Sequence, residues 1–328
     1  MSKVFKSSIR GLGAYLPEKI LTNFDLEKMV ETTDEWIRTR TGIQTRRIAA
    51  KGQSASDLGV HAGLEAIKDA GLTPLDIDLV IVATITPDMF FPSTACAIQN
   101  KIGAKCGAFD MAAACSGFPY AISVADAFIR SGTYKNILVV GAEVLSGFID
   151  WSDRSTCVLF GDGAGAAVVS RSEDGHGVLA NILGADGSQG ELLKIPGGGS
   201  VNPPSEETLK NKLHYLKMQG SEVFKVAVRT MEVAVRDLLE NAGLQISDVN
   251  WLIPHQANMR ILQAVSERLE IPNEKVFINV ERYGNMSSAS TAVAFYEAVK
   301  TGKVKKGDHI VLVAFGGGLT WASTLIKW

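Results

Sequence analysis

The distribution of apolar and polar residues along the chain predicts an α/β protein. Short runs rich in valine and isoleucine, with little polar alternation, are typical of strands buried on both faces of a sheet. We expect such strands at residues 78–86, 136–142, 164–170, 249–254 and 309–315. Longer segments with apolar residues at helical spacing lie between them, and we expect helices at residues 56–70, 116–131, 221–242, 258–269 and 286–300. Strands that alternate with helices in this way are typical of the α/β class.

Part of this pattern occurs twice. The stretch AIKDAGLTPLDIDLVIV (66–82) matches LLENAGLQISDVNWLIP (238–254), and each reads as a helix end, a glycine cap, a short loop and a strand. Further on, SGTYKNILVVGAE parallels TGKVKKGDHIVLVAF in the same order. We therefore expect two similar α/β halves, formed by residues 1–174 and 175–328. The glycine- and proline-rich stretch 196–212 is expected to be a surface insertion.

Composition limits what the protein can bind and where it works. The chain has 328 residues, of which 46% are hydrophobic and 21% are charged, an ordinary globular balance. A formal net charge of −2 gives no overall attraction to nucleic acid. The N-terminus MSKVFKSSIRGLGAYLPEK lacks the apolar core of a secretory signal, and the apolar runs are too short to span a membrane. We expect a cytoplasmic protein with no membrane or nucleic-acid partner.

The cysteines give no sign of a metal site or a disulfide framework. None of the four forms a Cys-x-x-Cys pair, and none has histidine at zinc-like spacing: Cys96, Cys106, Cys115 and Cys157. We expect reduced thiols and no bound metal.

The stretch GDGAGAAVVS, from Gly161, resembles a dinucleotide-binding fingerprint. Such a fingerprint requires a helix after the glycines. Here AAVVS continues as a strand and runs into the turn EDGHG. The glycines are therefore expected to permit close packing, and nucleotide binding is rejected.

Cys115 lies in the stretch DMAAACSGFPYAISVADAF, where an extended segment meets the start of a helix. Pro119 falls in the first helical turn, where its missing N–H has no cost. The helix N-terminus favours a thiolate, so we expect the pKa of Cys115 to be lowered. Small residues on both sides leave room for a substrate.

Two further polar residues occupy equivalent junctions. His255, in NWLIPHQANMRILQAV, follows the end of a buried strand, where open α/β sheets commonly place their sites. Asn285, in ERYGNMSSASTAVAFYEAV, stands in the second half roughly where Cys115 stands in the first. Near the C-terminus, Gly316 to Gly318 separate two strand-like runs, and one of their N–H groups is expected to serve an oxyanion hole.

Six motifs together resemble β-ketoacyl-acyl carrier protein synthase III, the initiating condensing enzymes of type II fatty acid synthesis. They occur in family order from about residue 9 to the C-terminus: TDEWIRTRTGI, AAACSGF, FGDGAGAAV, PHQANMR, YGNMSSAS and FGGGLTW. The resemblance implies a thiolase-like fold of two duplicated halves in five α-β-α-β-α layers, usually as a homodimer. It also implies that a short acyl-coenzyme A primer condenses with malonyl-acyl carrier protein, without a cofactor.

The resemblance assigns roles to individual residues. Cys115 is implied as the acylated nucleophile, completed by His255 and Asn285, with N–H groups of Cys115 and Gly317 as the oxyanion hole. The residues implied for coenzyme A are Thr32, Trp36, Arg40, Arg154 and Asn258. Phe91 of a partner subunit is implied in the acyl pocket and Phe224 in the pantetheine tunnel. The residues implied for the acyl carrier protein are Gln256, Ala257, Asn258, Met259 and Arg260.

The chemistry agrees with these residue types. Loss of CO₂ from a malonyl group gives an enolate, which an amide N–H of Asn285 and a neutral imidazole of His255 protonated on Nε2 would stabilise. Alternatives are a polyketide-type ketosynthase, another thiolase-fold enzyme, a papain-like cysteine hydrolase and a non-catalytic scaffold. Thiolases would use a second cysteine near the C-terminus, and residues 158–328 contain none. The acyl primer stays open between acetyl, propionyl and branched groups.

Overall fold

The computed structural model describes residues 5–172 and 176–328 and has the α/β architecture expected. A five-stranded sheet has the order β1-β7-β6-β4-β5. Its strands are β1 (Lys6–Tyr15), β4 (Leu79–Ala83), β5 (Gly107–Met111), β6 (Asn136–Glu143) and β7 (Gly163–Ser172). β4 runs parallel to β5 and β6, whereas β7 is antiparallel to β6 and β1. Every residue of β4 is buried, which explains its continuous apolar sequence.

A four-stranded sheet repeats this topology in the order β11-β12-β13-β8. Its strands are β8 (Gly177–Ala185), β11 (Trp251–Pro254), β12 (His309–Gly316) and β13 (Thr320–Lys327). β11 is parallel to β12, and β13 is antiparallel to both of its neighbours. A parallel bridge from Leu252 to Val276 takes the place that β5 has beside β4. The duplication predicted from the sequence is therefore confirmed in the order and direction of the strands.

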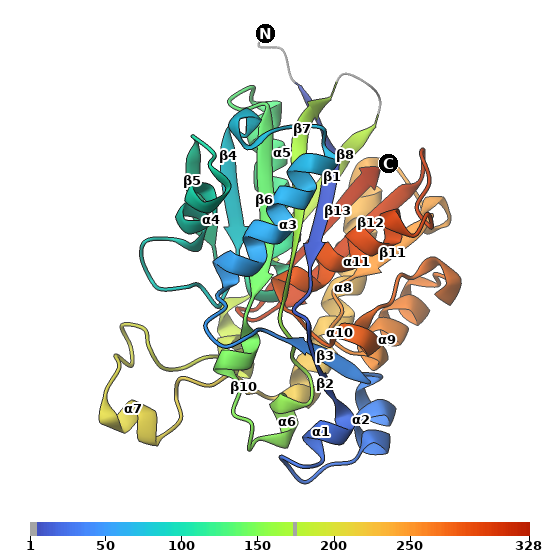
Figure 1. Ribbon diagram of the computed structural model, residues 1–328. Coiled ribbons are helices and arrows are strands. Elements are labelled where there is room, and N and C mark those ends of the chain that lie inside the picture. Colours follow the sequence, from blue (N-terminus) through green and yellow to red (C-terminus); the bar gives the residue numbers. More distant parts are fainter. Residues whose placement is uncertain (1–4, 173–175) are drawn as a thin grey trace.

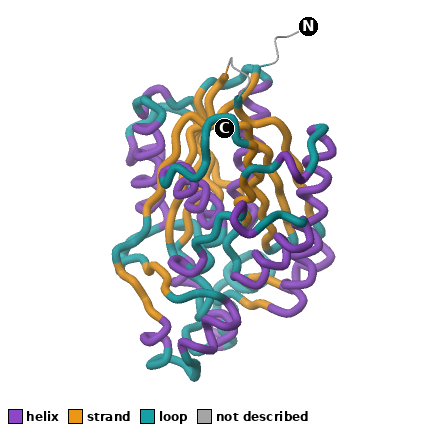
Figure 2. Tube along the Cα trace, turned by 90° about the vertical axis from the view of Figure 1, so that its right-hand side faces the viewer, coloured by secondary structure: helices purple, strands orange, loops and turns teal. Residues whose placement is uncertain are grey.

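Three layers of helices alternate with the two sheets, so the molecule has five layers (Figure 1). α5 (Gly117–Arg130) and α11 (Ser288–Lys300) lie between the sheets, where their apolar side chains share one core with strands of both. α3 (Ala55–Asp69) and α4 (Thr94–Ile102) pack on the outer face of the first sheet. α8 (Gly220–Ala242) and α9 (Met259–Leu269) pack on the second. Figure 2 shows helices on both outer sides of the strands.

The smaller elements gather at one end of the molecule, at the bottom of Figure 1. They are β2 (Lys19–Thr22), α1 (Asn23–Leu26), α2 (Asp34–Thr41), β3 (Thr45–Ile48), α6 (Arg154–Cys157), β9 (Leu193–Lys194), α7 (Glu206–Lys210), β10 (Lys217–Met218) and α10 (Val280–Tyr283). Stretch 196–212 is a surface insertion, as predicted, although its short helix α7 was not expected. Its base is closed by a hydrogen bond from the Gly197 N–H to the Leu213 carbonyl (2.7 Å).

The glycines after Gly161 serve close packing, as expected, and a strand rather than a helix follows them. A Cβ at Gly165 would lie 2.5 Å from the Cβ of Ala292, so β7 and α11 approach each other too closely for a side chain at this position of β7. The turn EDGHG and the predicted boundary between residues 174 and 175 fall largely on residues 173–175, outside the described part of the chain. Within the described residues, no helix is long and apolar enough to cross a membrane.

Candidate active site

Cys115, His255 and Asn285 line one cavity of about 180 Å³, although they are far apart in sequence. Cys115 lies in a 3₁₀ turn (Ala114–Ser116) between β5 and α5. His255 directly follows β11, and Asn285 lies between α10 and α11. The loops that follow the parallel strands of both sheets thus meet at one end of the molecule, and they bring the three side chains together.

The main chain around Cys115 is tightly confined. Ala114 has φ of +46°, a conformation that residues with a side chain rarely adopt. On the other side, a Cβ at Gly316 would lie 2.5 Å from the Cys115 nitrogen, so only glycine fits at the end of β12. Gly317 lines a cavity together with Cys115. The glycines that close the chain therefore lie against the thiol-bearing turn, as the sequence predicted.

The predicted effect of the helix N-terminus on Cys115 is wrong for this structure. The residue is 6% exposed. Burial raises the pKa of the Cys115 thiol to about 12, because a thiolate loses its hydration in an apolar cavity, while the Ser287 hydroxyl acts in the opposite direction. Desolvation outweighs the partial charge at the start of α5.

His255 is buried and neutral. It is 3% exposed, and its main-chain N–H donates to the carbonyl of Val313 (2.7 Å). Burial lowers the pKa of His255 to about 3. Nδ1 has no hydrogen-bond partner in the described part of the chain. Because a buried N–H without a partner is the costlier of the two states, this favours the tautomer that carries its proton on Nε2.

Asn285 is held from both sides. Its main-chain N–H donates to the Leu159 carbonyl (2.8 Å), and its carbonyl accepts from the Gly161 N–H (3.0 Å). The side-chain Oδ1 accepts the N–H of Ser287 (2.8 Å), which orients the amide. The NH₂ group is therefore the part of Asn285 available to donate to a ligand in the cavity.

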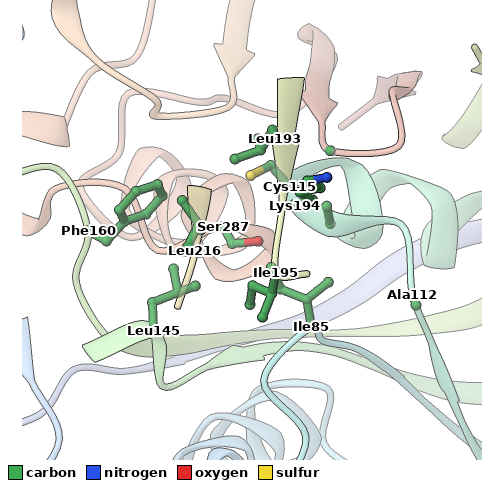
Figure 3. A pocket seen from close by; sticks show the side chains of 12 residues that line it. Ile85, Ala112, Cys115, Leu145, Phe160, Leu193, Lys194, Ile195, Leu216 and Ser287 are labelled. Carbon is green, nitrogen blue, oxygen red and sulfur yellow. The ribbon is translucent and has the colours of Figure 1, made fainter. Parts of the chain in front are cut away.

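A second cavity, of about 310 Å³, adjoins Cys115 and is lined mainly by aliphatic residues (Figure 3). They include Ile85, Leu145, Ile195 and Leu216. Phe160 and Leu193 line both this cavity and the one that holds His255 and Asn285. The thiol thus stands between a cavity that contains three polar side chains among apolar ones and a cavity that is mainly aliphatic.

Three of the residues predicted for coenzyme A form one cluster near the protein surface. The guanidinium groups of Arg40 and Arg154 lie 5.0 Å and 4.7 Å from the centre of the Trp36 ring. Arg154 also donates to the carbonyl of Glu31 (3.0 Å), beside Thr32. Asn258 caps α9 by accepting the Ile261 N–H (3.0 Å). It also lines the cavity that holds Cys115, His255 and Asn285, which we call the triad cavity.

Other predicted positions differ from expectation. The α8 side of the triad cavity is formed by residues such as Val223 and Ala227, and Phe224 is not among them, so its role in a pantetheine tunnel stays a prediction. Phe224 instead lies half-buried with the Arg260 guanidinium 5.7 Å from its ring. Phe91 is 84% exposed and lies outside both cavities of its own chain.

Gln256 was predicted to contact the carrier protein, and this is wrong, because the residue is completely buried. Its amide donates to the carbonyls of Pro254 (2.8 Å) and Phe277 (3.1 Å). Its oxygen accepts the N–H groups of Asn279 (2.9 Å) and Val280 (3.2 Å). Gln256 therefore ties the loop after His255 to the segment before α10. Ala257, Asn258 and Met259 are half-buried, and Arg260 is exposed.

Sequence reasoning missed the polar residues behind the site. Glu143 and Ser288 are fully buried near Cys115 and bond to each other (2.9 Å). Ser287 lines the apolar cavity and influences the thiol. A glutamate at the end of an apolar strand was the available signal. Within residues 5–172 and 176–328, no group of three or more His, Cys, Asp or Glu residues could hold a metal ion.

Comparison with known proteins agrees with this site. Residues 109–187 match the family described as "3-Oxoacyl-[acyl-carrier-protein (ACP)] synthase III", and residues 239–328 match its "C terminal" family. "Beta-ketoacyl-[acyl-carrier-protein] synthase III" of Caldanaerobacter subterraneus is 56% identical over 329 residues, covering 100% of this chain and 99% of the relative. The enzyme of the same name from Desulfitobacterium hafniense is 54% identical, covering 98% of this chain and 97% of the relative.

Solved structures are similarly close. The crystal structure of 3-oxoacyl-[acyl-carrier-protein] synthase III from Aquifex aeolicus has a TM-score of 0.92 at 52% identity, covering 98% of this chain and 100% of that one. The priming β-ketosynthase from the R1128 polyketide biosynthetic pathway also has a TM-score of 0.92, at 36% identity, covering 99% of this chain and 97% of that one. The chain belongs to the β-ketoacyl-acyl carrier protein synthase III family and is therefore an acyl-transferring condensing enzyme of the initiating step of type II fatty acid synthesis.

Proposed function

We propose that the protein transfers a short acyl group from coenzyme A to Cys115 and condenses it with malonyl-acyl carrier protein. The products are 3-oxoacyl-acyl carrier protein, coenzyme A and CO₂. The observation that carries this proposal is the shared cavity of Cys115, His255 and Asn285. A nucleophile and two neutral hydrogen-bond donors in one buried space suit a reaction in which negative charge develops on a thioester oxygen.

Acylation exchanges one thioester for another. The Cys115 sulfur attacks the acyl carbonyl carbon, and the bond from that carbon to the coenzyme A sulfur breaks. The thiol proton of Cys115 leaves with coenzyme A. N–H groups of Cys115 and Gly317 hold the oxyanion of the tetrahedral intermediate. The aliphatic cavity beside Cys115 then receives the acyl chain.

Condensation needs a carbanion at neutral pH. The malonyl thioester loses CO₂, and the electron pair moves toward its carbonyl oxygen as an enolate. Asn285 NH₂ and His255 Nε2–H donate to that oxygen, which requires the neutral imidazole that burial favours. The enolate carbon attacks the acyl group on Cys115, and the cysteine sulfur leaves as a thiolate that takes up a proton from water. Each step uses only these residues, so no metal or organic cofactor is required.

Residues near the protein surface are proposed to bind coenzyme A and the acyl carrier protein. Trp36 is the proposed platform for the adenine ring, with Arg154 and Arg40 proposed to contact adenine and phosphate and Thr32 and Asn258 proposed to lie nearby. Because the Arg154 guanidinium lies 4.7 Å from the centre of the Trp36 ring, it would have to move for adenine to enter between them. Exposed Arg260, with Ala257 and Met259 beside it, is the proposed contact for the acidic carrier protein.

We also propose a cytoplasmic homodimer in which each chain consists of two halves that meet near residue 175. Met89, Phe90 and Phe91 are exposed by 54%, 79% and 84%, which is unusual for three consecutive large apolar residues. A second copy covering them would bring Phe91 to the partner's acyl cavity. Sedimentation of the protein and of Phe90→Asp would test this, and a monomeric wild-type protein would contradict it.

The direct test incubates the protein with malonyl-acyl carrier protein and a panel of acyl-coenzyme A donors, with product identification by mass spectrometry. We expect 3-oxoacyl-acyl carrier protein from short donors, and none from Cys115→Ala. A priming ketosynthase of polyketide synthesis is the second candidate, since such an enzyme has the same fold. Preference for longer primers and for a different carrier protein would favour that candidate.

A further inference from the structure

Glu143, the last residue of β6, is a fully buried carboxyl group that the proposed chemistry does not use. Its hydrogen-bond partners within residues 5–172 and 176–328 are hydroxyl groups and a main-chain N–H, and none of them carries a positive charge. An ionised carboxylate in this place would lose its hydration without gaining a counter-ion. The hydrogen bonds of Glu143 therefore indicate whether its carboxyl group is protonated.

One oxygen of Glu143 receives donors. Thr86 Oγ1 lies 2.6 Å from Oε2 and Thr84 Oγ1 lies 3.3 Å from it, and the Ile85 N–H is shared between Oε2 (3.2 Å) and Oε1 (3.4 Å). Each threonine oxygen already accepts a main-chain N–H, from Val144 (2.9 Å) and from Thr86 (3.1 Å). The hydroxyl protons of both threonines are thus free to point at Oε2.

The other oxygen meets a group whose proton is already used. Ser288 Oγ lies 2.9 Å from Glu143 Oε1 and 2.7 Å from the carbonyl oxygen of Ala83. A carbonyl only accepts, and the serine has one proton, which the shorter contact assigns to Ala83. With its proton on Ala83, Ser288 can only accept from Glu143, so a proton on Oε1 makes both contacts hydrogen bonds, beside the longer approach of the Ile85 N–H to the same oxygen (3.4 Å). Burial acts in the same direction, since it raises the pKa of Glu143.

Ser288 stands where the two halves of the active site meet. It is the first residue of α11 and follows Asn285 by one short turn. A Cβ at Gly141 would lie 2.8 Å from the Ser288 carbonyl oxygen, and a Cβ at Gly117 would lie 3.4 Å from the Ser288 Cβ. The serine therefore has little room to move between the strand that ends in Glu143 and the helix that follows Cys115.

We propose that Glu143 is a positioning residue held as a neutral carboxylic acid, which donates through Ser288 to Ala83 and so fixes the start of α11 beside Asn285. The neutral form also keeps a second charge from the nucleophile. Burial is the main cause of the raised pKa of Cys115, and the charge of an ionised Glu143 is a smaller cause that acts in the same direction. This inference builds on the proposed roles of Cys115 and Asn285, but its protonation claim stands apart from activity.

Infrared difference spectra test that claim directly. Wild-type minus Glu143→Gln at pH 7 should show the C=O stretch of one protonated carboxyl group. The subtraction cancels Asp126 and Asp162, the other carboxyl groups whose pKa burial raises. Ser288→Ala should shift the band, because the acceptor of the proton is removed. A difference spectrum with only carboxylate bands would overturn the proposal.

The positioning role has a separate readout. Glu143→Ala should lower malonyl decarboxylation more than tenfold while acylation of Cys115 falls by less, and Glu143→Gln should restore most of the loss. Equal loss in both variants would overturn the positioning role. If Glu143→Ala does not fold, as judged by circular dichroism, the Gln and Ser288→Ala variants still decide. A wild-type protein with the infrared band but no condensing activity would refute the proposed function and leave the protonation claim intact.

Discussion

The two cavities that meet at Cys115 both have many apolar side chains, but only one of them also holds the polar side chains of His255, Asn258 and Asn285. One presents an amide, an imidazole and the cap of α9 to the thiol, and the other presents aliphatic side chains such as Leu145 and Ile195. A developing charge is stabilised by donors that are already oriented, whereas an acyl chain is held by apolar area. The same sulfur can therefore serve two steps without moving between sites. Substitutions on one side should change one step and spare the other.

The largest difference between the two steps is expected when Asn285 is replaced. Asn285→Ala should lower condensation by about 10²–10³, because the enolate loses one oriented donor. Acylation of Cys115, which uses the other donors, should stay within a few-fold of wild type. Mass spectrometry of the acyl-enzyme measures the first step, and release of labelled CO₂ measures the second. An Asn285→Ala protein that cannot be acylated would contradict the division between the two sides.

The second test concerns the thiol itself. Because burial raises the pKa of Cys115 to about 12, its thiolate fraction near pH 8 should be roughly 10³ lower than that of an ordinary cysteine. Iodoacetamide should label the exposed Cys96 first, and labelling of Cys115 should still rise above pH 9. Peptide mapping after timed exposure separates the two residues. Rapid labelling of Cys115 that levels off below pH 7 would restore the prediction made from the helix N-terminus.

The polar side should also respond to pH in its stability. With the pKa of His255 lowered from 6.5 to about 3, the unfolded chain binds a proton below pH 6.5 that the folded protein excludes. Stability from this group is present above pH 6.5 and is lost as the pH falls. Between pH 6.5 and pH 5 the loss should be about 2 kcal/mol.

Urea unfolding of the wild type and of His255→Gln at pH 6.5 and pH 5 measures how much of the free energy of unfolding is lost. Other groups titrate in both proteins, so the difference between the two slopes isolates His255. Equal slopes would mean that the imidazole takes up a proton in the folded protein. That result would also remove the neutral donor on which the proposed decarboxylation depends.

Local patterns were enough to predict the α/β class, the duplication and the three polar residues of the triad cavity, whereas the five-layered arrangement was implied only by the family resemblance. Cys115, His255 and Asn285 each stand at a junction of elements, and a buried strand or a helix cap marks that junction in the sequence. The predicted helices agree with α3, α5, α8, α9 and α11 to within two residues at each end. Periodicity identifies such elements because their buried faces are continuous.

Properties that arise from distant segments could not be predicted in this way. Gln256 is buried because Phe277, Asn279 and Val280 supply its hydrogen-bond partners, and nothing in the PHQANMR motif marks them. The pKa of Cys115 follows from the closure of the cavity by segments such as Leu193 and Phe160 rather than from its own helix. Glu143 is similar, since its partners come from two other segments of the chain, residues 84–86 and Ser288.

The apolar side offers the smallest expected effect and the most specific one. Ile195→Ala should move the preference between donors toward the longer acyl chain by about tenfold, since one or two methylenes in a pocket are worth ~1–3 kcal/mol. The matched control is Val223→Ala, which removes methyl groups from the triad cavity alone. It should leave the ratio of kcat/KM values for acetyl- and isobutyryl-coenzyme A unchanged. Because both substitutions shorten an aliphatic side chain, a similar shift in the two variants would mean that the acyl chain does not distinguish the two cavities. A shift in Ile195→Ala alone would place the chain on the side lined by Leu145 and Leu216, and the carrier arm on the other.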